Sequence, residues 1–76
     1  MKDLVTYIAS SLVDDPGAVR VRETGGPRET RLDLRVSSQE VGRLIGREGR
    51  TIRAMRTLLS VAGKKAGRKF TLEIQE

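Results

Sequence analysis

The feature that most constrains the fold is a pair of glycines that interrupts helix-period sequence near the middle of the chain. Leu44 and Ile45 precede Gly46, two polar residues follow it, and an isoleucine recurs three residues after Gly49. Apolar residues at helical spacing run up to this Gly-x-x-Gly segment and away from it. We therefore predict two helices joined by a tight turn, because glycine lets a backbone approach its neighbours without a Cβ in the way.

The sequence before this turn changes from a helical period to a strand period. Residues 3–13 place apolar side chains, and Tyr7 with them, on one helical face, and Asp14-Asp15-Pro16-Gly17 ends that helix. Residues 19–22 and 31–36 alternate apolar with polar side chains on either side of Gly25-Gly26-Pro27. This pattern predicts a β-hairpin with one buried face and one wet face.

Two helices and a strand are predicted after the hairpin. Ser37 and Glu40 match a capping box, in which each side chain satisfies a backbone donor of the other residue, at the start of a short helix. A longer helix runs from about Arg50 to Ala62, with exits at Gly63 and Gly67, and residues 70–74 alternate in a closing strand whose Phe70 is expected in the core.

The predicted order is α-β-β-α-α-β, an α+β fold in one domain over residues 1–76. The connection between the second and third strands contains two helices and should be right-handed, which makes those strands parallel. The hairpin partner is antiparallel. We expect a three-stranded mixed sheet with three helices on one face and water on the other.

Composition excludes several classes of chemistry. The chain has no cysteine and no histidine, so disulfides, the usual zinc sites, thiol nucleophiles and imidazole catalysis are all ruled out. We expect no enzyme, no metal, no cofactor and no small-molecule substrate. No apolar run approaches the ~20 residues that span a bilayer, and no signal-peptide pattern begins the chain. The expectation is a cytoplasmic protein without a membrane partner.

Positive charge is concentrated around the glycines. Residues 42–69 carry nine basic side chains against Glu48 alone, whereas residues 1–41 have a net charge of −1. This asymmetry is typical of a surface that binds a polyanion. A solvated basic helix accounts equally well for the charge alone. The same alternative applies to Arg53 and Arg56, which lie on the polar side of the longer helix and could track phosphates.

The residue types at positions 46–50 suit contact with an anionic strand. A Cβ at Gly46 or Gly49 would block close approach or forbid the required dihedral angles. The helix that begins near Arg50 presents unpaired N–H groups and the positive end of its dipole. Arg47 adds a guanidinium that can hold phosphate oxygens, and Glu48 offsets part of that charge. The spacing fits neither a dinucleotide-binding loop nor a P-loop.

With the element order and the charge, the segment Ile45-Gly46-Arg47-Glu48-Gly49-Arg50-Thr51-Ile52 resembles the loop of a type II KH domain. The resemblance covers essentially the whole chain, whose length is similar to that of the small stand-alone bacterial KH-domain RNA-binding proteins. It implies that the loop holds the backbone of about four nucleotides of single-stranded RNA. The bases would lie in a groove beside the loop. The implied groove residues are Val41, Leu44, Ile45 and Ile52, with Leu34 or Val36 as the opposite wall.

The resulting prediction is a set of RNA contacts around the turn. The predicted contacts are Arg43, Ile45, Gly46, Arg47, Glu48, Gly49, Arg50, Ile52 and Arg53.

The resemblance also implies a protein partner, either a second copy or a larger KH-domain RNA-binding protein, in regulation of small RNAs or messengers. In some bacteria the family is linked to cell elongation and division. The residues agree independently, because the longer helix has two apolar stripes. The first stripe is Ile52, Met55, Leu59 and Ala62, and the second, a predicted dimer interface, is Ala54, Leu58 and Val61. A small domain that buries one wide stripe explains the same pattern.

Two functions therefore compete at this point. The first is a non-enzymatic RNA-binding module with low sequence specificity, and the second is an adaptor that docks on a partner RNA-binding protein, with RNA binding incidental.

Overall fold

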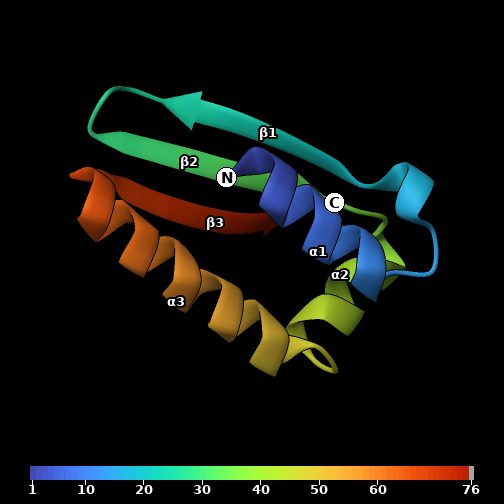
Figure 1. Ribbon diagram of the computed structural model, residues 1–76. Helices are drawn as coiled ribbons and strands as arrows, with labels where there is room; N and C mark the ends of the chain where they lie inside the picture. Colours follow the sequence, from blue (N-terminus) through green and yellow to red (C-terminus); the bar gives the residue numbers. More distant parts are fainter. Residues whose placement is uncertain (76) are drawn as a thin grey trace.

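The computed structural model describes residues 1–75 as a three-stranded sheet with its helices packed on one face (Figure 1). The elements are α1 (Lys2–Leu12), the short 3-10 helix η1 (Pro16–Ala18), β1 (Arg20–Gly25), β2 (Glu29–Arg35), α2 (Ser38–Ile45), α3 (Gly49–Ala66) and β3 (Lys69–Gln75). The predicted α-β-β-α-α-β order is confirmed. This is the architecture of a type II KH domain.

The central strand of the sheet is β2. It pairs antiparallel with β1, placing Val21 opposite Leu34, and parallel with β3, placing Leu32 opposite Leu72. The chain between β2 and β3 contains α2 and α3, so the two-helix crossover and the mixed sheet are both confirmed. As an edge strand, β3 runs beside α3, as Figure 1 shows in red and orange.

Alternation along β2 separates the core from the open face. Thr30, Leu32 and Leu34 are buried under the helices, and the residues between them point to the other face. The open face is polar: Arg31 lies 2.7 Å from the Asp33 carboxylate, a hydrogen-bonded pair that raises the pKa of the arginine. The apolar core consists of Val5, Ala9, Val19, Leu32, Leu34, Val36, Leu44, Ile52, Met55, Leu59 and Leu72.

Two aromatic residues lie closer to the surface than the sequence predicts. Tyr7 is 72% exposed, so its prediction as a core residue is wrong, and Phe70 is only partly buried at the edge of the sheet. Only Val5 and Ala9 of α1 are fully buried. The stripe of α1 that is fully buried against the sheet is therefore narrower than the apolar face predicted from the sequence.

The capping box at the start of α2 is absent. Ser37 is the N-cap, but its side chain makes no capping hydrogen bond. The Glu40 carboxylate instead accepts a hydrogen bond from the backbone N–H of Asp14, at 3.2 Å, and lies 3.8 Å from Arg43. A long-range contact therefore replaces the predicted local one.

The long helix α3 extends one turn beyond its predicted end at Ala62 and stops at Gly67, the second of the two predicted exits. Gly63 remains helical and buried, and the helix ends at Gly67, whose φ of 68° is left-handed. The N–H of Arg68 donates to the carbonyl of Gly63 at 2.8 Å, a common way for helices to end. Within residues 1–75, no helix is both long and apolar enough to cross a membrane.

Candidate nucleic-acid interface

The Gly-x-x-Gly segment forms the turn between α2 and α3. The N–H of Gly46 donates to the Gly42 carbonyl at 2.9 Å, and that of Glu48 donates to the Arg43 carbonyl at 3.0 Å. Gly46 has a φ of −84°, and the positive φ values among the described glycines belong to Gly25 and Gly67. Of the two alternative reasons predicted for glycine at these positions, unusual dihedral angles are therefore excluded.

Space explains the two glycines better than dihedral angles. A Cβ at Gly46 would lie 3.0 Å from the Gly42 carbonyl oxygen, a tight contact inside the turn. A Cβ at Gly49 would meet only the Arg53 guanidinium, at an ordinary 3.6 Å. The fold itself thus restricts position 46. At position 49 the missing side chain leaves the start of α3 bare, where an incoming backbone can approach it.

The start of α3 is an electropositive surface. No side chain caps the helix; the N–H of Gly49 donates to the Gly46 carbonyl at 3.4 Å and that of Ile52 to the Glu48 carbonyl at 3.0 Å. The N–H groups of Arg50 and Thr51, between them, have no acceptor within the helix and add to the positive end of the dipole. Arg47 and Arg50 are exposed beside them. A shallow hollow of about 450 Å³ lies here, lined by residues 46–51 and Arg53.

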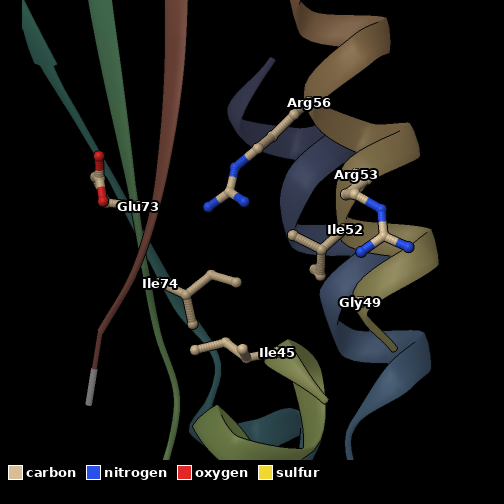
Figure 2. Close-up of a pocket in the computed structure, with 7 residues that line it drawn as sticks. All are labelled: Ile45, Gly49, Ile52, Arg53, Arg56, Glu73 and Ile74. Atoms are coloured by element: carbon tan, nitrogen blue, oxygen red, sulfur yellow. The ribbon is translucent and has the colours of Figure 1, made fainter. Parts of the chain in front are cut away.

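A groove of about 380 Å³ adjoins the turn, between α2, α3 and β3, and its lining combines three isoleucines with Arg53 and Arg56. Figure 2 shows Ile45, Ile52 and Ile74 pointing toward one another from these three elements. Ile45 is 63% exposed at the mouth, whereas Ile52 is buried and forms the floor. Gly49 and Arg53 line both the groove and the turn hollow, so the two are continuous.

The opposite wall of the groove is β3, not the strand predicted for it. Leu34, Val36 and Leu44 are buried in the core, and none of them lines the groove. The apolar residue of this wall is Ile74 of β3, which is partly buried. The sequence contained a signal for this, because the right-handed crossover that makes β3 parallel also places it beside α3.

Arg43 is the predicted RNA contact that the geometry argues against. Its guanidinium lies 2.6 Å from the Asp14 carboxylate, which fastens α2 to the chain after α1. This hydrogen bond, with the charge of Asp14, raises the pKa of Arg43. The positive charge is therefore already neutralised within the fold, and Arg43 is not among the residues that line the turn or the groove.

Arg56 lies at the groove but outside the set of predicted RNA contacts, although it is one of the two arginines expected to be able to track phosphates. Arg56 extends from α3 across the groove, and its Nη2 donates to the Leu72 carbonyl at 3.2 Å (Figure 2). Glu73 of β3 also borders the groove, but its side chain points away from the groove, to the other side of the strand (Figure 2). The second apolar stripe of α3 lies outside the groove, with Leu58 56% and Val61 49% exposed. Residues 1–75 contain no group of three or more Asp or Glu residues that could hold a metal ion.

Comparison with known proteins decides the family. A family model described as "KhpA/KhpB, KH domain" matches residues 2–74. This chain belongs to the KhpA/KhpB KH-domain family. No solved structure was found to match it.

Relatives in the KhpA/KhpB family match along nearly their whole length. The chain is 43% identical over 76 residues to the RNA-binding protein KhpA of Aquifex aeolicus, covering 100% of the chain and 96% of the relative. It is 45% identical over 73 residues to KhpA of Treponema pallidum, covering 96% and 91%. KhpA of Clostridium perfringens is 43% identical over 74 residues, covering 97% and 99%.

Proposed function

We propose that the protein binds single-stranded RNA, with the strand's backbone against the Gly46–Gly49 turn and its bases in the groove of Ile45, Ile52 and Ile74. The observation that carries this proposal is the continuity of an uncapped, arginine-flanked helix start with a groove that holds three isoleucines. Phosphates suit the first surface and unstacked bases suit the second. The relatives named RNA-binding protein KhpA support the same assignment. The chain acts here as a binding module and not as an enzyme.

Each residue of the turn has a distinct role in this proposal. Arg47 and Arg50 are exposed and supply phosphate contacts, while Gly49 leaves the helix start open to the strand. Arg53 lies where the turn meets the groove and can follow the strand from one to the other. Glu48 is partly buried and weakens the positive field, which limits the affinity of a single domain.

The test is a double substitution, Arg47→Asp with Glu48→Asp. It replaces a guanidinium at the turn with a carboxylate, so a fluorescence anisotropy titration with single-stranded RNA should show at least about a tenfold loss of affinity. Far-ultraviolet circular dichroism should remain unchanged, since both side chains lie outside the core.

The matched control is Lys2→Asp, which makes the same change of charge at the exposed first turn of α1. That variant should bind RNA like the parent protein. Equal binding by the parent and the double variant would show that the turn does not hold the strand.

A second function, docking on a protein partner, is favoured by the exposed stripe of Ala54, Leu58 and Val61. Isolated apolar side chains are common on surfaces, but these three lie together on one face of α3. We infer that this face associates with a second copy or with a larger KH-domain protein. Association would place two turns on one RNA and raise their combined affinity.

A further inference from the structure

The groove beside the turn continues past Arg56. A second hollow of about 300 Å³ lies between α3 and the outer edge of β3, and it shares Arg56 and Glu73 with the first. Arg56 crosses the boundary between α3 and β3, here called the seam, by its hydrogen bond to the Leu72 carbonyl. The two hollows therefore lie end to end along one seam, with the arginine as a partition.

The lining of the second hollow suits a flat, partly polar ligand. Leu59, Phe70 and Leu72 give it an apolar floor, and the Arg56 guanidinium borders it. Phe70 is the chain's one phenylalanine, and the Arg68 guanidinium lies 5.6 Å from its ring centroid. An aromatic ring in an open hollow is the side chain on which a nucleobase stacks.

Positive charge follows the same seam away from the turn. Arg53, Arg56, Ser60 and Lys64 recur every three or four residues and so share one face of α3. From Gly49 to Lys64 this face is roughly 22 Å long at 1.5 Å per residue. Lys65 and Lys69 are exposed at its far end. A strand that leaves the turn would meet cations along the whole helix.

The edge of β3 favours RNA over a protein strand as the occupant. The backbone N–H of Lys69 and the carbonyl of Gln75 form hydrogen bonds on the β2 side of β3. Because backbone groups alternate in direction along a strand, those of Phe70, Leu72 and Ile74 face the seam. A protein strand would need the Leu72 carbonyl, which Arg56 already occupies. The basic border gives a further preference for a polyanion.

We propose that the hollow of Arg56, Leu59, Phe70 and Leu72 is a further nucleobase subsite, which holds a base of the same RNA strand beyond the nucleotides at the Gly46–Gly49 turn. This subsite rests on the proposed function and extends the footprint past the four nucleotides that a KH loop holds. Phe70 supplies the stacking surface, and Arg56 separates this base from those in the first groove.

Nuclear magnetic resonance titration with oligouridylates of four and eight nucleotides tests the subsite directly. The short oligonucleotide should shift the amide signals of residues 46–53 alone, and the long one should also shift those of residues 70–72. Phe70→Leu should then lower the affinity for the eight-nucleotide RNA by about tenfold and leave the four-nucleotide affinity unchanged. The longer RNA offers more positions at which a protein can bind, but this advantage is the same for the parent and for Phe70→Leu. It therefore cancels when the affinities of the two proteins are compared.

A second variant keeps the test independent of folding. Ser60 is exposed between Arg56 and Lys64, so Ser60→Glu adds a negative charge at the seam without touching the core. It should weaken binding of the long RNA only. Gln39→Glu, which adds the same charge at the exposed first turn of α2, is the control.

The outcomes separate this subsite from the function on which it rests. Failure of the parent protein to bind either RNA would reject the proposed function. Normal binding of the short RNA, with no additional signals shifted and no loss in either variant, would reject the subsite alone. If Phe70→Leu abolished self-association and spared RNA binding, the hollow would be a protein surface and the subsite would also be rejected.

Discussion

At the scale of single residues, Gly63 shows how closely α3 lies against the chain that follows it. A Cβ built on Gly63 would overlap the carbonyl oxygen of Arg68 and would also press on the Phe70 ring. Gly63→Ala should therefore lower the free energy of unfolding by about 1–3 kcal/mol, the usual cost of overpacking, despite the better helix propensity of alanine. Urea denaturation followed by circular dichroism measures the change.

Gly42→Ala is the matched control for this substitution. Gly42 is also helical, but a Cβ there meets nothing within 4 Å, so alanine should stabilise the protein by up to about 1 kcal/mol. The same glycine-to-alanine substitution should thus lower the free energy of unfolding at position 63 and raise it at position 42. Two variants of equal stability would contradict the packing of α3 described here.

At the scale of elements, α1 rests on the sheet through one narrow stripe. Val5 is fully buried, whereas Tyr7 is 72% exposed two residues later. Val5→Ala should destabilise the protein by about 2 kcal/mol, because it removes roughly two buried methyl groups and leaves a cavity. Tyr7→Ser should change the stability by less than about 0.5 kcal/mol. Thermal and urea unfolding of the two variants compare these effects.

The tyrosine serves as the control for the valine in this pair. A large loss of stability in Tyr7→Ser would mean that the aromatic side chain is covered, either by a rotated α1 or by a second molecule. Repeating that measurement at several protein concentrations separates the two explanations, since only association depends on concentration.

At the scale of the whole molecule, the exposed face of α3 predicts association. Leu58 lies at the centre of the stripe with Ala54 and Val61, and it contributes nothing to the monomer core. The parent protein should sediment as a dimer at high micromolar concentration, and Leu58→Asp should sediment as a monomer because an unpaired carboxylate cannot be buried at low cost. A two-fold symmetric contact would bring the two copies of this stripe together.

The control for Leu58→Asp is Gln39→Asp, which adds a carboxylate at the exposed start of α2. It should leave the dimer intact. A parent protein that is monomeric throughout the concentration range, and recovered without a partner from cells, would remove both self-association and the adaptor function.

The order of elements could be predicted because the apolar period changes clearly at residues 19, 37 and 69, whereas several side-chain contacts could not. The Glu40 carboxylate does not form the predicted capping box because two other groups interact with it. One is the backbone N–H of Asp14, which is distant in sequence, and the other is Arg43, on the next turn of the helix. Tyr7 occupies the margin of a helical stripe, where the period alone does not decide burial.

The turn of the candidate site could be predicted from the local sequence, whereas the strand that faces it across the groove could not. The turn at Gly46–Gly49 follows from local sequence, but its partner wall depends on which strand occupies the edge of the sheet. Because β2 is central, its apolar residues are covered on the helical face, and Ile74 of β3 borders the groove instead. Arg43 resembles its neighbours in sequence and differs from them through its ion pairs with Asp14 and, at a longer distance, Glu40.

The parallel pairing of β2 with β3 also determines when a working site can exist during synthesis. The hairpin and the glycine turn are both translated before β3, but the groove wall is made from residues 69–75. A nascent chain paused after α3 would carry the arginines and the start of α3 without this wall. Under the proposed function, it would gain a place for the bases only when β3 pairs with β2.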